Sequence, residues 1–107
     1  MNFPFDKKKY EAAILAGQIV WRKHALEKLI SRGISRYEVL DVALHGELIQ
    51  TYLEDKPYPS ILLLGFAESR PLHVVLSFND EDSTVFIITT YEPDTKVFNP
   101  DFKTKRN

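Results

Sequence analysis

Three equally spaced residues near the start of the chain have side chains that can transfer a proton or bind phosphate. His24, Lys28 and Arg32 are four residues apart, which places them on one side of an α-helix. A histidine exchanges a proton near neutral pH, and two cations stabilise the negative charge of a phosphate. The spacing therefore predicts a phosphate-binding, proton-transferring surface, although an ordinary solvated helix face gives the same pattern.

Two more candidates lie in the second half of the chain. His73 interrupts an otherwise apolar segment, so its ring needs either a hydrogen-bond partner or an exposed position. Tyr91 stands where a predicted strand ends, before Glu92 and Pro93. Its side chain can bond a phosphate, stack on a base or pack at an interface. For both residues, a structural role and a functional role stay open.

The C-terminal sequence FKTKRN supplies Lys103, Lys105 and Arg106. Together with Lys28, the last two are predicted RNA-binding residues, while a basic end is also typical of a soluble, disordered tail. No HExxH or other metal-ligand spacing occurs in the sequence, and the absence of cysteine excludes disulfides and zinc–thiolate sites. We expect no metal and no cofactor.

Length and composition indicate one globular domain over residues 1–107, because 44% of the residues are hydrophobic and 27% are charged. The sequence has neither an apolar run of about 18 residues nor a signal-peptide pattern, which predicts a cytoplasmic protein that does not contact the membrane. The net charge of -1 argues against a strongly basic nucleic-acid binder. Residues 1–46 carry +3 and residues 47–107 carry -4, so a locally basic face is still expected.

Two helices are predicted in the first third of the chain. Asp6 can cap a helix over about residues 7–16, which Gly17 can end. At 100° per residue, segment 23–32 separates into an apolar arc and a polar arc, and Gly33 supplies its end. The residues expected to face the core are Tyr10, Ile14, Leu15, Ala25, Leu26, Leu29 and Ile30.

A third helix is predicted over residues 36–45. Ser35, followed three residues later by Glu38, forms a capping-box pattern at its start, and Gly46 follows its last residue. Its core-facing residues are expected to be Val39, Leu40, Ala43 and Leu44.

After Gly46 the sequence favours β-structure. The apolar segments are short and rich in β-branched and aromatic residues, and short turn sequences that favour hairpins separate them. We predict strands over residues 48–53, 60–66, 72–78 and 84–91. The expected fold class is α+β, with helices over about 7–45 packed on a four-stranded antiparallel sheet over about 47–91, and a tail over about 95–107. Residues 18–21 can also be extended.

The last predicted hairpin gives a register for the sheet. A five-residue loop over 79–83 pairs Phe78 with Thr84 and His73 with Thr89. His73 then lies near Ser77, Thr89 and Tyr91, on the face opposite the helices. The face that the helices cover is expected to contain Leu72, Val74, Leu76, Phe78, Phe86, Ile88 and Thr90.

Several of these segments resemble the bacterial domain-of-unknown-function family 4258 from Trp21 to Asp94. The segments are WRKHALEKLISRGISRYEVLDVALHGELIQTY, DKPYPSILLLG, RPLHVVLSF and IITTYEPD. The first part is also similar to the BrnT branch of the RelE-like toxins, in which helices precede an antiparallel sheet and RNA is cut without metal. That similarity implies four catalytic residues, which are His24, Arg32, His73 and Tyr91. Thr89 and Thr90 stand where many RelE-like enzymes have a basic residue.

The sequence hypothesis is therefore a metal-independent endoribonuclease of the toxin type, acting on RNA or at the ribosome and paired with an antitoxin protein. His24 or His73 would be the base or acid, Arg32 would hold the phosphate, and Tyr91 would orient the nucleotide. The alternative is a non-catalytic protein–protein interaction module of the same fold, which the acidic second half and the missing strand cation favour.

Overall fold

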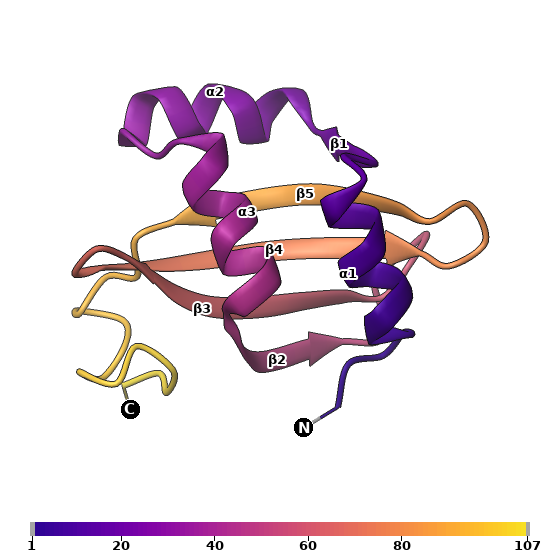
Figure 1. Cartoon of the computed structure of the whole chain (residues 1–107). Coiled ribbons are helices and arrows are strands. Elements are labelled where there is room, and N and C mark those ends of the chain that lie inside the picture. The colour runs from indigo at the N-terminus through magenta and orange to yellow at the C-terminus, as the bar shows by residue number, and fades with distance from the viewer. Residues whose placement is uncertain (1, 107) are drawn as a thin grey trace.

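The computed structural model of the chain describes residues 2–106, so Met1 and Asn107, the two ends of the predicted domain, lie outside the described residues. Within that range the chain forms an α+β fold, as predicted (Figure 1). The helices are α1 (Lys7–Leu15), α2 (Lys23–Arg32) and α3 (Arg36–His45). The strands are β1 (Ile19–Trp21), β2 (Glu47–Tyr52), β3 (Ser60–Ala67), β4 (Arg70–Asn79) and β5 (Thr84–Tyr91). None of the helices in the described range is long and apolar enough to cross a membrane.

The strands form one five-stranded sheet in the order β1-β5-β4-β3-β2. β1 runs parallel to β5, and the other neighbours are antiparallel. The prediction of four antiparallel strands is therefore wrong in the number of strands and in the direction of one pair. Its reasoning compared only strands that follow one another along the chain. β1 pairs instead with the last strand, by contacts such as Val20 with Phe86.

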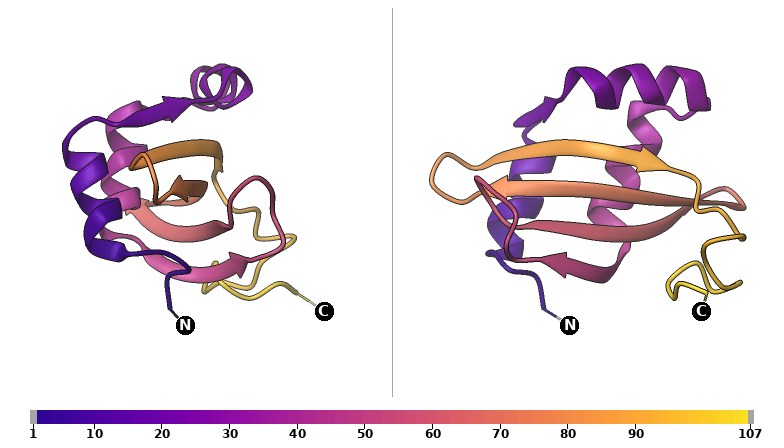
Figure 2. Two further views of the ribbon diagram at one scale, coloured as in Figure 1. Left: turned by 90° about the vertical axis from the view of Figure 1, so that its right-hand side faces the viewer. Right: turned by 180° about the vertical axis from the view of Figure 1, so that it is seen from behind.

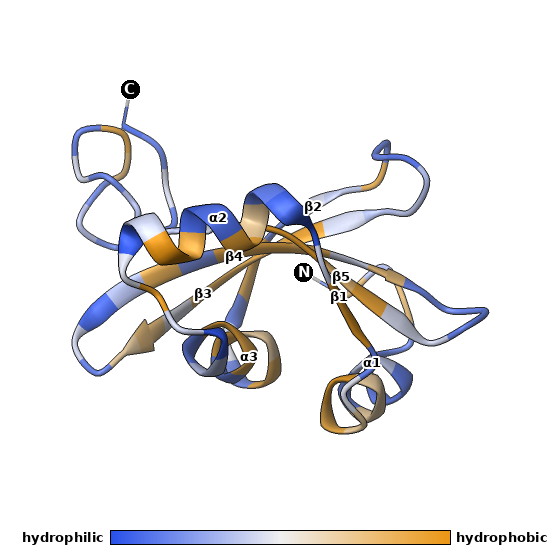
Figure 3. Ribbon diagram, turned by 90° about the horizontal axis from the view of Figure 1, so that it is seen from above, coloured by the Kyte–Doolittle hydropathy of each residue, from blue (hydrophilic) through white to orange (hydrophobic). Residues whose placement is uncertain are grey.

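The two faces of the sheet are covered by different parts of the chain. Helices α1 and α3 pack on one face, here called the inner face, and α2 lies beside β5 at the edge of the sheet (Figures 1 and 3). The opposite, outer face carries the C-terminal segment over residues 92–106 near one end of the strands (Figure 2). The outer face is therefore only partly covered.

Local signals in the sequence set the helix ends as predicted. The Asp6 carboxylate accepts hydrogen bonds from the backbone N–H groups of Lys8 and Lys9, which caps α1. The capping box of α3 is complete, because Ser35 and Glu38 each accept a hydrogen bond from the other's backbone N–H. Gly33 ends α2 in the left-handed conformation, at φ 65°.

The inner face and its helices form the apolar core. Most of the predicted helix residues are buried or half-buried there, but Leu15 is 76% exposed and Ile30 is 84% exposed. These two predictions are wrong because Leu15 lines an open groove between α1 and α3, and because α2, at the edge of the sheet, buries only part of its apolar arc. Val42, which was not predicted to face the core, is buried.

Helix α3 approaches β3 unusually closely at Val42. A Cβ atom added to Gly65 would lie 2.6 Å from Cγ2 of Val42, and one added to Gly46 would lie 2.5 Å from the Val42 carbonyl oxygen. Both glycines are thus required by the space between the helix and the sheet.

The register of β4 against β5 differs from the prediction. Phe78 pairs with Val85, and His73 pairs with Tyr91 instead of Thr89. The hairpin is shifted by one residue, and Ile88 is an unpaired bulge residue that changes the alternation of β5. The inner face therefore contains Val85 and Ile87 in place of Phe86 and Ile88, while Thr90 lies on the inner face and His73 on the outer face, as predicted.

Candidate functional site

A cleft of about 450 Å³ opens on the outer face, between β2 and the C-terminal segment. Aromatic, cationic and amide side chains share its wall with apolar ones, and none of the residues that line it is acidic. Its lining residues are Ile49, Gln50, Tyr52, Leu62, Tyr91, Phe98, Lys103, Thr104 and Lys105. The cleft is thus suited to an anionic ligand that carries a flat ring.

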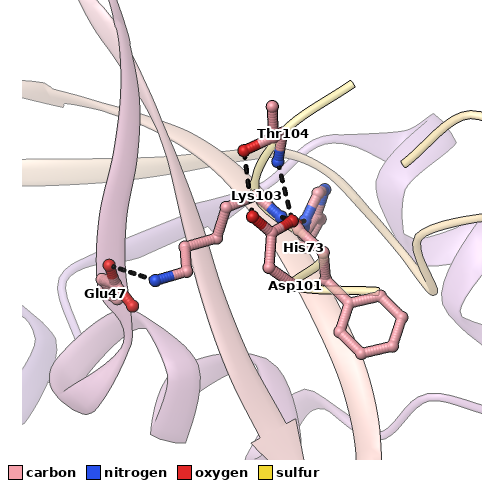
Figure 4. A network of polar contacts seen from close by, with 6 residues as sticks. Glu47, His73, Asp101, Lys103 and Thr104 are labelled. Atoms are coloured by element: carbon pink, nitrogen blue, oxygen red, sulfur yellow. Dashed lines mark hydrogen bonds and ion pairs between the residues drawn. The ribbon is translucent and has the colours of Figure 1, made fainter. Parts of the chain in front are cut away.

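The C-terminal segment forms one wall of this cleft and is held in place by polar contacts. The Asp101 carboxylate accepts hydrogen bonds from the backbone N–H groups of Lys103 and Thr104 and from the Thr104 hydroxyl (Figure 4). The Lys103 ammonium lies 3.1 Å from the Glu47 carboxylate on β2. An isolated β-bridge joins Phe98 to Lys105. The Asp101 contacts and the bridge thus fold the segment on itself, the Lys103–Glu47 pair joins it to the sheet, and Lys103 and Lys105 line the cleft.

His73, on β4, joins the sheet to this C-terminal segment. Its side chain is completely buried, with the rings of Tyr91 and Phe98 packed edge-on against it. Nε2 lies 2.6 Å from the Phe102 carbonyl oxygen, and Nδ1 lies 3.2 Å from the Tyr91 hydroxyl. Burial lowers the pKa of His73, and the Phe102 hydrogen bond opposes this shift only in part. The ring is consequently neutral at neutral pH, and both of its nitrogens are occupied.

Tyr52 and Tyr91 enter the cleft from β2 and β5. Burial raises the pKa of the Tyr91 hydroxyl, as does the nearby Tyr52, while the positive charge of Arg32 acts in the opposite direction. Burial also raises the pKa of Tyr52, with a further contribution from the negative charge of Asp55. Both phenols therefore stay protonated at neutral pH and are suited to stacking and hydrogen bonding.

The structure brings together three of the four residues that the RelE-like similarity implied. Arg32 donates a hydrogen bond of 2.6 Å from Nη1 to the Thr90 carbonyl oxygen, beside Tyr91, and Tyr91 contacts His73. His24 is the second residue of α2, roughly 12 Å from Arg32 along the helix axis at 1.5 Å per residue. Its side chain is 92% exposed and lies 3.7 Å from the Glu27 carboxylate. His24 therefore lies apart from the cleft.

A comparison with protein families identifies the chain from its sequence. The family model described as Domain of unknown function (DUF4258) matches residues 21–92, which is most of the chain. The chain belongs to this family. No curated protein matches the chain.

The DUF4258 match divides the cleft. It begins at Trp21, the last residue of β1, and ends at Glu92, just after β5. It includes Tyr52, His73 and Tyr91 but neither Lys103 nor Lys105. The two tyrosines of the cleft therefore lie within the family match, whereas Phe98 and the two lysines lie outside it.

The predicted RNA-binding residues are in three different environments. Lys105 lines the cleft. Arg106 follows it, but its Nε donates to the Thr95 carbonyl oxygen at 2.5 Å. Lys28 is exposed on α2, away from the cleft lining.

Sequence reasoning missed Gln50, Tyr52 and Thr104 as members of this site. The one available signal was the alternation of β2, which puts Gln50 and Tyr52 on the same face of the sheet as Leu62 and His73. Within residues 2–106, no three His, Asp or Glu side chains are grouped as metal ligands would be.

Proposed function

We propose that this protein binds single-stranded RNA in the outer-face cleft. The observation that carries the proposal is the set of side chains that line the cleft. Tyr52 and Tyr91 line it together with Lys103 and Lys105, and none of its lining residues is acidic. Lysine attracts the phosphate backbone, and tyrosine provides a surface on which an unpaired base can stack. The Gln50 amide adds a donor and an acceptor for a base edge.

Size and charge favour a single strand over a duplex. A volume of about 450 Å³ is within the range of small-ligand pockets, so it accommodates an exposed base but not a double helix. Duplex binding relies on an extended basic surface, whereas this chain has a net charge of -1. Local contacts at the cleft would therefore supply the affinity.

Metal-independent cleavage of the bound RNA stays a prediction. Attack by a ribose 2′-hydroxyl on its neighbouring phosphate needs a proton acceptor and a proton donor at the same phosphate. Both ring nitrogens of His73 are occupied, and His24 lies at the far end of α2. This arrangement supports RNA binding more strongly than cleavage by a pair of histidines.

The test is fluorescence anisotropy with a short, labelled single-stranded RNA. We expect saturable binding that weakens as salt is added. Lys105→Ala should bind more weakly, and the slope of its log affinity against log salt concentration should be smaller by about one, the value for one phosphate contact. Lys96→Ala is the matched control, because Lys96 belongs to the same segment but does not line the cleft. Its affinity should equal that of the wild-type protein.

The same mixtures, incubated in EDTA and separated on a denaturing gel, test cleavage. Intact RNA indicates binding alone, and products ending in a 2′,3′-cyclic phosphate would establish the ribonuclease. No binding by folded protein would contradict the proposal and favour the interaction module. The partner would then have the groove between α1 and α3 available, about 310 Å³ in volume, where Leu15 and Tyr37 are exposed.

A further inference from the structure

The contact between His73 and the C-terminal segment determines which ring nitrogen carries a proton. A carbonyl oxygen only accepts hydrogen bonds, so the 2.6 Å contact between Nε2 and the Phe102 oxygen requires a proton on Nε2. A neutral imidazole has one N–H, which leaves Nδ1 as an acceptor. The buried ring of His73 is neutral at neutral pH because burial lowers its pKa.

This tautomer in turn fixes the hydrogen of Tyr91. Nδ1 of His73 lies 3.2 Å from the Tyr91 hydroxyl oxygen. Because Nδ1 has no proton to give, the Tyr91 O–H must be the donor in this contact. The phenol has one hydrogen, and burial raises its pKa so that it keeps that hydrogen. The lone pairs of the oxygen are left for the cleft that Tyr91 lines.

We propose that the Tyr91 oxygen acts in the cleft only as a hydrogen-bond acceptor, and that it selects RNA over DNA by accepting a hydrogen bond from a ribose 2′-hydroxyl. The inference rests on the proposed function and adds its sugar specificity. A phosphate oxygen also only accepts, so Tyr91 cannot bond a phosphate while it donates to His73. Lys105 is the cleft-lining donor for the phosphates, since the Lys103 ammonium is bonded to the Glu47 carboxylate.

His73 is a positioning residue in this arrangement. It lies beneath Tyr91, is completely buried and contacts the C-terminal segment, so it acts on the ligand only through the phenol. A hydrogen-bond donor on a nucleobase could also bond to the Tyr91 oxygen. The oligonucleotides must therefore distinguish a base donor from the ribose 2′-hydroxyl. Oligo(U) and oligo(dU) share the same base, including its ring N–H donor, and differ only by the 2′-hydroxyl, so a difference between them is due to the sugar.

The experiment compares the Kd values of oligo(U), oligo(dU) and 2′-O-methyl oligo(U). For the wild-type protein we expect oligo(U) to bind roughly 5- to 100-fold more tightly than the other two, which is the range for one hydrogen bond at a buried site. Tyr91→Phe should bind all three with the affinity of oligo(dU). Tyr37→Phe is the matched control and should keep the preference, because Tyr37 lines the groove between α1 and α3 and not the cleft.

Each outcome has a separate meaning. Equal binding of oligo(U) and oligo(dU) by the wild-type protein, or an unchanged preference in Tyr91→Phe, would overturn the sugar specificity and leave RNA binding standing. Failure of all three to bind would overturn the proposed function and the specificity together.

A ligand-free measurement keeps the inference testable if Tyr91→Phe fails to fold. Long-range ¹H–¹⁵N NMR of the wild-type protein should show His73 protonated at Nε2 and unprotonated at Nδ1 near neutral pH. A proton on Nδ1 would contradict the inference, since Tyr91 could then accept from the histidine and donate into the cleft.

Discussion

The same strands form both faces of the sheet, but the side chains on the inner face pack in the apolar core, whereas those on the outer face include the ones that line the cleft. In β3, Leu63 belongs to the inner face and is completely buried under the helices, whereas its neighbour Leu62 faces outward and lines the cleft. In β4, Leu72 and Val74 are in the apolar core, and His73 between them faces the C-terminal segment. Strand alternation thus puts packing on one side and polar chemistry on the other.

What covers each face explains the difference. Two regular helices close the inner face, which is apolar except for the buried Thr90 of β5, and the Tyr10 hydroxyl of α1 donates to the Ala43 carbonyl oxygen of α3. The outer face is partly covered by a segment that the His73–Phe102 hydrogen bond and the Lys103–Glu47 ion pair join to the sheet, while the bridge from Phe98 to Lys105 folds the segment on itself. A helix would fill the space above the strands, whereas this segment leaves a cleft.

The sharpest test of this comparison is a pair of leucines that adjoin in sequence. Leu63→Ala should lower the free energy of unfolding by about 2–5 kcal/mol, because it leaves a cavity in the apolar core. Leu62→Ala should cost less, since one side of Leu62 already borders the cleft. Urea denaturation of both variants measures the difference, and equal losses would mean that the two faces are equally packed.

A second test addresses how tightly the helix layer is fitted to the inner face. Gly65→Ala should destabilise the protein by about 1–3 kcal/mol, because the new methyl group would overlap Val42. Adding Val42→Ala should recover part of that loss by removing the overlapping atoms. Thermal or urea unfolding of the single and double variants measures the coupling, and fully additive losses would show that the clash is absent.

A smaller effect is expected from the outer face as the pH is lowered. An unfolded histidine has a pKa of about 6.5, and burial lowers the pKa of His73 in the folded protein. The unfolded chain therefore binds this proton first, so the free energy of unfolding is highest above about pH 6.5 and falls as the pH drops below it.

His73→Phe should remove that part of the pH dependence. The measurement is urea unfolding of both proteins at a series of pH values from about 7.5 down to 5.5. The difference in stability between the wild-type protein and the variant should be constant at the upper end and shrink toward the lower end. A difference that stays constant throughout would show that His73 is protonated equally well in the folded and unfolded states.

The helices were predictable from the sequence because their signals are local. The capping box of Ser35 and Glu38 and the glycine at position 33 act within a few residues, and the predicted range 23–32 coincides with α2. The sheet depends on contacts between distant residues, which explains two errors. The pairing of β1 with β5 and the bulge at Ile88 leave no mark on the local alternation pattern.

The candidate site was predictable only in part, for the same reason. His73 and Tyr91 were identified by type, and their contact follows from the pairing of β4 with β5. The cleft itself depends on where residues 92–106 lie, and that segment has no periodic apolar pattern from which a position could be inferred. Tyr52 therefore gained its significance only from the structure.

The most direct test of the central claim is a residue-by-residue map of where single-stranded RNA binds. Isotope-labelled protein is titrated with oligo(U), and the backbone ¹H–¹⁵N spectra are followed. The account predicts chemical-shift changes concentrated at Gln50, Tyr52, Tyr91, Lys103 and Lys105, with α1 and α3 unaffected. Changes confined to the groove around Leu15 and Tyr37, or no changes at all, would contradict it.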